Sequence, residues 1–239
     1  NLQETMQEFE FINSSKYVVA WIDCTTKGKN FGKSIVFKGE HVRKDEFPEK
    51  TISEKITIIN KKKIKIPFVF PSWVLSPFTI KIFNFLYYLI NSNKKTSFVD
   101  YDTFFYPLDA IENWNLIYGT KGFIQYQFVI PKDKSFDGLT KILKIFNKNK
   151  IYPFLTVLKL MGSKNKGALS FPMKGYTLAC DFPINKNLFK MLDEIDLLLI
   201  NYNGRVYLSK DSRISKKSFN LMYADEIKSF NLNADLKTK

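Results

Sequence analysis

The sequence contains few of the residues that hold metals or form disulfides. Cys24 and Cys180 are the only cysteines among 239 residues, which excludes a disulfide framework and a four-cysteine metal site. His41 is the only histidine, which excludes most zinc and non-haem iron sites and any Ser-His or Cys-His catalytic pair that does not use this residue. His41 lies in a polar stretch, so we expect it in an exposed loop, and we predict no metal site.

Glycine-rich phosphate loops are also missing. Neither the G-x-G-x-x-G pattern nor the Walker pattern occurs, so the chain has no motif with which to bind a nucleotide by itself. The first ten residues are acidic and lack an apolar core, which is unlike a secretory signal. Three prolines, Lys81 and Asn84 interrupt the most hydrophobic stretch, 64–90, and leave too short an apolar run to cross a bilayer.

Apolar side chains and positive charge are abundant. A hydrophobic content of 45%, with 16% aromatic residues, is ample for a packed core. The net charge of +14 favours polyanionic partners, such as nucleic acid, an anionic membrane surface or a phosphorylated substrate. The densest basic cluster, Lys61 to Lys63 with Lys65, lies in an expected loop without arginine or interleaved aromatic residues. Because nucleic-acid sites usually carry a basic stripe on a recognisable motif, we predict no nucleic-acid partner.

The residue patterns predict an α+β fold. The first half of the chain is expected to form a helix within 1–13, a hairpin of strands 16–24 and 32–38, a long loop over 39–63 with one strand at 56–59, and a helix from Pro77 to Ile90. The second half is expected to form a strand at 123–130, a helix at 135–149, strands at 154–160 and 177–182, a helix capped by Asn185 and ending near Tyr202, a strand at 206–208 and a helix capped by Ser215. This order is typical of a large antiparallel sheet covered on one face by helices.

The helix expected from Pro77 is apolar on most of its surface. Burial in the protein core is the interpretation that we favour for it. A peripheral membrane contact is the alternative, since basic residues flank the segment and such helices can lie in a membrane interface.

One polar pair lies in the strand predicted at 123–130. Gln125 and Gln127 share a face with Phe123 and Val129, while the alternate residues form an apolar face. The two amides can bind sugar hydroxyls or the edge of a flavin ring. Equally, they can belong to a strand that faces solvent.

A second polar group lies near the C-terminal end. Gly204 is suited to end a helix in the left-handed conformation. The short strand after it brings Tyr207, Lys210, Asp211 and Arg213 into one turn. Lys210 either pairs with Asp211 or faces an anionic group, and the residues by themselves favour the ion pair.

Several motifs occur in one order and resemble, as a set, a known family. They are Ala20-Trp21-Ile22-Asp23, Tyr106-Pro107-Leu108-Asp109, Gly122 to Pro131, Leu169-Ser170-Phe171-Pro172, Asp181-Phe182-Pro183, Gly204-Arg205-Val206-Tyr207 and Lys210-Asp211-Ser212-Arg213. The region from Tyr17 to Tyr223 resembles the C-terminal half of the decaprenylphosphoryl-β-D-ribose 2'-oxidase family. That family falls within the vanillyl-alcohol-oxidase-type flavoenzymes, which include the D-arabinono-1,4-lactone oxidases.

The resemblance implies an FAD-dependent oxidoreductase. The implied reaction is oxidation of a sugar secondary alcohol, on a polyprenylphosphoryl pentose or an aldonolactone, by hydride transfer to flavin N5. In the family an FAD-binding domain precedes this region and holds most of the FAD. We therefore expect residues 1–15 to link to that domain, residues 16–228 to form the substrate-binding cap domain and residues 229–239 to be a polar tail. By itself the chain is expected to be inactive.

The resemblance also implies partners and a location. The expected partners are a sugar or lipid-linked sugar phosphate substrate, the FAD-binding domain of the same polypeptide and a short-chain reductase of the same pathway. The expected location is the cytoplasm or the periphery of the inner membrane. The competing interpretation is a non-catalytic basic module that binds a membrane surface or nucleic acid.

Site residues are carried over by position. Lys210 and Tyr207 match catalytic positions beside the flavin, and Gln127 matches a further flavin contact. The matching substrate positions are Gln125, Gln127, Lys159, Trp21, Thr177 and Ala179. Some relatives carry Asn and Cys where this chain has Thr177 and Ala179, and one has Tyr in place of Phe105. Cys180 lies one residue after the position at which some relatives carry Cys. We therefore expect its side chain on the opposite face of the strand and outside the site.

Overall fold

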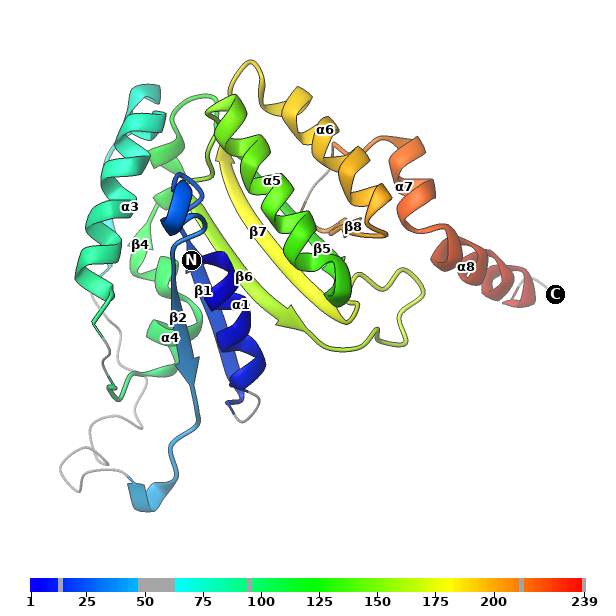
Figure 1. The fold of residues 1–239 in the computed structure, drawn as a ribbon, viewed down its shortest axis with the longest axis horizontal. Helices are drawn as coiled ribbons and strands as arrows, with labels where there is room; N and C mark the ends of the chain where they lie inside the picture. The colour runs from blue at the N-terminus through cyan, green and yellow to red at the C-terminus, as the bar shows by residue number, and fades with distance from the viewer. Residues whose placement is uncertain (13–14, 47–62, 94–95, 211–212, 238–239) are drawn as a thin grey trace.

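The computed structural model describes residues 1–12, 15–46, 63–93, 96–210 and 213–237 (Figure 1). Its helices are α1 (Leu2–Phe11), α3 (Pro77–Asn91), α4 (Tyr101–Phe105), α5 (Ser135–Asn149), α6 (Leu188–Asn201), α7 (Lys216–Met222) and α8 (Ala224–Lys237). Its strands are β1 (Tyr17–Ile22), β2 (Ser34–Gly39), β3 (Ile64–Lys65), β4 (Ile111–Glu112), β5 (Phe123–Pro131), β6 (Leu155–Met161), β7 (Gly175–Pro183) and β8 (Arg205–Val206).

The centre of the fold is a six-stranded sheet in the order β2-β1-β6-β7-β5-β8. Every neighbouring pair in it is antiparallel, while β3 and β4 form a separate parallel pair. The hairpin predicted from strands 16–24 and 32–38 is confirmed, since β1 and β2 pair from Tyr17 opposite Gly39 to Ile22 opposite Ser34. The α+β class with a large antiparallel sheet is confirmed.

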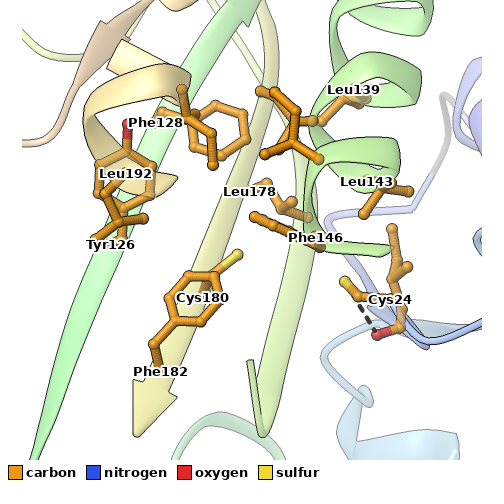
Figure 2. Close-up of a cluster of buried hydrophobic side chains, with 14 of the residues drawn as sticks. Cys24, Tyr126, Phe128, Leu139, Leu143, Phe146, Leu178, Cys180, Phe182 and Leu192 are labelled. Carbon is orange, nitrogen blue, oxygen red and sulfur yellow. Dashed lines mark hydrogen bonds between the residues drawn. The ribbon is translucent and has the colours of Figure 1, made fainter. Parts of the chain in front are cut away.

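Helices cover one face of this sheet. In Figure 1, α5 and α6 lie across the front of β7 and β5, and α1 lies beside them. On β5 the side chains directed to this face are Tyr126, Phe128 and Ile130, all fully buried. Figure 2 shows Tyr126 and Phe128 in a cluster with Leu139, Leu143 and Phe146 of α5 and with Leu178, Cys180 and Phe182 of β7. The predicted alternation of β5 is therefore confirmed, and its other face is left for Gln125 and Gln127.

The ends of the helices follow the prediction in part. Ser215 caps α7 as predicted, since its Oγ accepts from the backbone N–H of Ser218 at 3.0 Å. The prediction that Asn185 caps α6 is wrong: the N-cap is Asn187, and the side chain of Asn185 accepts from the N–H of Asn187 instead. A loop hydrogen bond has replaced the cap that the sequence favoured.

The role predicted for Gly204 is also wrong. The left-handed residue after α6 is Asn203, with φ of 56°, and not Gly204. Gly204 is needed for a different reason, because a Cβ atom there would lie 2.7 Å from the carbonyl oxygen of Val129. Glycine therefore allows the chain to approach β5 closely enough to begin β8.

Helix α3 contradicts the prediction of a buried core helix. Only Ile80 and Asn84 are buried, while Phe78, Phe85, Leu89 and most of its other apolar residues are exposed. Hydrophobicity alone favoured burial, but the body of the protein covers only one narrow side of this helix. Among the described residues, no helix is long and apolar enough to cross a bilayer.

Both ends of the chain are helical within the described range. α1 is capped by Asn1, and its Leu2, Thr5 and Phe9 are buried. α8 continues through Ser229, where the sequence indicated the start of a polar tail. The domain limits at 15 and 228 stay predictions. The strand expected at 56–59, most of the loop 39–63 and the residues Lys61 and Lys62 lie outside the described residues.

Candidate functional site

The face of the sheet opposite α5 and α6 carries all six of the predicted site residues that lie on strands. They are Trp21 of β1, Gln125 and Gln127 of β5, Lys159 of β6, and Thr177 and Ala179 of β7. Side chains alternate along a strand, and residues directly opposite one another in an antiparallel pair point to the same face. Tyr207 and Lys210 follow β8 at the edge of the same sheet.

Strand register aligns these residues in rows across the sheet. One row runs from Gln127 to Ala179, then to Val157 and to Trp21, and so crosses four strands. In the next row Thr177 lies between Val129 and Lys159. These pairings join residues between 18 and 136 positions apart in the sequence, so the rows are a product of the sheet order and not of local sequence.

Thr177 fixes the position of Gln127. The amide Nε2 of Gln127 donates to Thr177 Oγ1 at 3.1 Å, and this hydroxyl donates to the carbonyl oxygen of Phe128 at 2.8 Å. Thr177 is buried, so both hydrogen bonds are shielded from water. Thr177 therefore influences this face of the sheet by holding the neighbouring amide of Gln127.

The turn after β8 brings Lys210 to β5. The N–H of Tyr207 donates to the carbonyl oxygen of Gln127 at 2.8 Å, and the N–H of Lys210 donates to the carbonyl oxygen of Tyr207 at 3.1 Å. Lys210 Nζ then donates to Gln125 Oε1 at 3.0 Å. Phe171 stacks on Tyr207, with ring centroids 4.6 Å apart, and so orients the phenol.

A shallow pocket of about 330 Å³ opens beside this turn. It is lined by Phe123, Ile124, Gln125, Ser209 and Lys210. Gln125 is a neutral partner, so its hydrogen bond with Lys210 orients the ammonium group without neutralising its charge. Asp211, the ion-pair partner that the sequence favoured for Lys210, lies outside the described residues.

Arg213, which was predicted in the same turn, has contacts on the helix side of the sheet. Its guanidinium lies 2.5 Å from Asp193 and 2.5 Å from Asp196, both on α6. Tyr126 OH also donates to Asp196, at 2.6 Å, from the helix face of the sheet. Arg213 therefore ties the chain to the helix layer, on the opposite side of the sheet from Lys210.

Asp181 is a site candidate that sequence reasoning missed. It lies opposite Gln125 in the register of β5 and β7, is 4% exposed, and its Oδ2 has no hydrogen-bond partner among the described residues. Burial raises the pKa of this carboxyl to about 6, although a hydrogen bond from Gln125 and the charge of Lys210 both lower it. The spacing of Thr177, Ala179 and Asp181 along one strand face was the signal that could have identified it.

Two predicted residues lie apart from the Lys210 pocket. Trp21 is at the far end of the Gln127 row and is buried under α3, where its ring lies 4.8 Å from that of Tyr87. Lys159 has an exposed side chain on β6. The structure thus brings together Gln125, Gln127, Thr177, Tyr207 and Lys210. In the register Ala179 lies next to Gln127 and Lys159 next to Thr177, while Trp21 lies on the same face at the far end of the row.

The expectation for Cys180 is confirmed. Its side chain is buried in the helix-side core near Cys24, as Figure 2 shows. Burial raises the pKa of the thiol well above its ordinary value, so the thiolate is scarce at neutral pH. His41 is exposed as expected, and its Nε2 lies 3.0 Å from the hydroxyl of Tyr17.

The chain is similar to known proteins over part of their length. The chain is 31% identical over 207 residues to a decaprenylphosphoryl-β-D-ribose oxidase from Mycolicibacterium smegmatis, a match that covers 87% of the chain and 45% of that protein. It is 37% identical over 68 residues to a Streptomyces coelicolor protein described as an uncharacterized protein in the mprA 5' region, covering 28% of the chain and 18% of that protein. No protein-family model matches the chain. The chain thus spans less than half of each relative, and the resemblance seen in the motifs is confirmed over most of its own length.

Proposed function

We propose that this chain, similar over most of its length to an oxidase, is the substrate-binding part of an FAD-dependent oxidoreductase that oxidises a sugar secondary alcohol. The arrangement of the open sheet face carries the proposal. Strands β5 and β7 and the turn after β8 bring two amides, a hydroxyl, a carboxylate and a lysine to a single surface, while the other face is closed by helices. Convergent polar groups beside apolar walls are typical of a small-molecule site.

The donors on this face fit the ring of a flavin. Lys210 offers an ammonium group, Gln127 an amide N–H and Tyr207 an aromatic ring, and these suit a flat, polar-edged ring that becomes negative on reduction. The diphosphate of FAD has no counterpart here, because the sequence contains no glycine-rich phosphate loop. We therefore assign this face to the ring and the substrate, and the remainder of the FAD to an FAD-binding domain in the same polypeptide. When bound, FAD would accept the hydride from the alcohol carbon.

Lys210 has the principal electrostatic role in this proposal. Its ammonium group lines the pocket and is held by Gln125 at 3.0 Å, so its direction is set before a substrate arrives. A fixed positive group stabilises the negative charge that develops when a hydroxyl loses its proton. By comparison with other preorganised donors this is worth about 3 kcal/mol.

Asp181 is the proposed proton acceptor. Its carboxylate is ionised at neutral pH with a pKa of about 6, and one oxygen has no partner among the described residues. A base is most effective when its pKa lies near the working pH, and burial brings this carboxyl closer to that value. Tyr118 and Lys210 are close enough to sense its charge.

The substrate is proposed to be a polyprenylphosphoryl pentose, with an aldonolactone as the alternative. Lys159 is exposed on the same face and could meet a phosphate, which an aldonolactone lacks. The proposed protein partner is a short-chain reductase that acts on the keto product. No nucleic-acid partner is proposed.

The test uses the natural polypeptide that carries this chain. We expect it to show flavin absorption, and anaerobic addition of decaprenylphosphoryl ribose to bleach the bands. Lys210→Ala should lower the rate of bleaching by a factor of about 100, with flavin content retained. The matched control is Lys174→Ala, which removes an exposed lysine in the loop before β7. A colourless protein, or equal rates for the two variants, would refute the proposal; bleaching by an aldonolactone alone would select the alternative substrate.

A further inference from the structure

Helix α3 presents a continuous apolar surface to the outside of the protein. We define this α3 face by Phe78, Ile82, Phe85, Leu86, Leu89 and Ile90, whose side chains are between 45% and 71% exposed. From Phe78 the chain reaches Ile82, the pair Phe85 and Leu86, and the pair Leu89 and Ile90 in steps of three or four residues, which places all six on one side of the helix. Trp73, which is 69% exposed, precedes α3 in the chain and contributes an indole near its N-terminal end.

The outward direction of this face is fixed by polar contacts on the inner side. Asn84 is buried, and its Nδ2 donates to Asp23 Oδ1 at 2.8 Å. Asp23 Oδ1 also accepts from Thr25 N–H and from Thr25 Oγ1. Because the buried polar residue must remain at this partner, α3 cannot rotate to bury its apolar side chains instead.

Aromatic contacts support the same orientation. Tyr87 packs on Trp21 with ring centroids 4.8 Å apart, and Phe83 packs on Phe154 at the same distance. The usual pattern of a surface helix, apolar inside and polar outside, is therefore reversed at the α3 face. An exposed apolar surface of this extent marks an interaction site.

The charge of the sequence segment that contains α3 indicates the kind of partner, although of its lysines the structure describes only Lys63, Lys65 and Lys81. The sequence from Lys55 to Val99 contains no aspartate or glutamate, although the whole chain has 23 acidic residues. The same stretch contains eight lysines: Lys55, Lys61, Lys62, Lys63, Lys65, Lys81, Lys94 and Lys95. An apolar helix within a basic, acid-free segment is complementary to an anionic lipid surface, which offers acyl chains and negative headgroups together.

We propose that the α3 face docks into the interface of an anionic lipid bilayer, with α3 lying in the plane of the membrane. The 15 residues of α3 are too few to span a bilayer, which is consistent with a helix that lies in the interface. Tyr87 links α3 to Trp21 on the open sheet face, so docking would hold that face near the membrane surface. This inference does not depend on the proposed reaction.

Vesicle binding of the natural polypeptide tests the inference. We expect it to sediment with phosphatidylcholine vesicles in which about one lipid in three is phosphatidylglycerol, and less with phosphatidylcholine alone or at high salt. The double variant Phe85→Gln with Leu89→Gln should bind about tenfold more weakly or worse, since it removes two apolar side chains from the centre of the face. Trp73 gives a second readout, a blue shift of its emission on vesicle binding.

The matched control replaces two equally exposed leucines on the other side of the molecule. Leu197 of α6 and Leu221 of α7 are 61% and 53% exposed, and Figure 1 places these helices away from α3. Their double replacement by Gln should leave vesicle binding unchanged. The inference fails if the polypeptide does not bind anionic vesicles, or if both double variants bind them equally. It also fails if light scattering shows a dimer that is lost only in the Phe85→Gln, Leu89→Gln variant, since a second copy of the chain would then occupy the face.

Discussion

Asp181 offers the sharpest test of how the open sheet face is built. Its carboxyl is almost completely removed from water, and its pKa is raised from 3.8 to about 6 by that burial. A raised pKa means that the folded protein binds the proton more tightly than the unfolded chain. The free energy of unfolding therefore falls as pH rises from about 4 to about 6, and the whole penalty is present above pH 6.

The size of the penalty follows from the two pKa values. One pKa unit corresponds to about 1.4 kcal/mol, so ionising Asp181 in the folded chain costs about 3 kcal/mol at pH 8. Asp181→Asn removes the charge and keeps the shape. We expect the variant to be more stable than the parent chain by up to about 3 kcal/mol at pH 8, and the difference to vanish near pH 4.

The assay is urea unfolding of the parent and the variant chains at one-unit steps from pH 4 to pH 8. Asp133→Asn, which alters an exposed aspartate, is the matched control and should show no comparable dependence on pH. A stability difference for Asp181→Asn that is constant over this range, or a variant that is less stable at pH 8, would contradict the explanation that burial of the Asp181 charge outweighs its compensation by Gln125 and Lys210.

Three further predictions concern the scaffold around the site. Gly204→Ala should destabilise the chain by about 1–3 kcal/mol, because its Cβ would lie 2.7 Å from the carbonyl oxygen of Val129. Gly162→Ala, whose Cβ meets no atom within 4 Å, should change urea stability by less than about 0.5 kcal/mol, and equal losses would refute the explanation. Ser215→Ala should cost about 1 kcal/mol by removing the cap of α7, and an unchanged urea midpoint would show that the cap contributes nothing. Cys180 should resist iodoacetamide at pH 8 in the native chain and react in urea, as mass spectrometry would show; rapid native labelling would mean that the thiol is accessible.

The sequence determined the local structure and the division of the strands into two faces. Period-two alternation is a property of the strand itself, so it placed Tyr126 and Phe128 on one face and Gln125 and Gln127 on the other without any tertiary information. The same argument placed Cys180 on the face opposite Thr177 and Ala179, where the structure shows it buried. The class of fold followed from the order of helices and strands, because elements in this order can pack as an antiparallel sheet covered by helices.

Only the tertiary structure decided which residues meet and how buried they are. The rows that align Gln127 with Ala179 and Trp21 depend on strand order, and the pKa of Asp181 depends on what surrounds it after folding. Hydrophobic content predicted a buried α3, but one hydrogen bond from Asn84 to Asp23, 61 residues apart, holds the apolar side outward. A pattern records which side of a helix is apolar, whereas the direction of that side is set by partners that lie far away in the sequence.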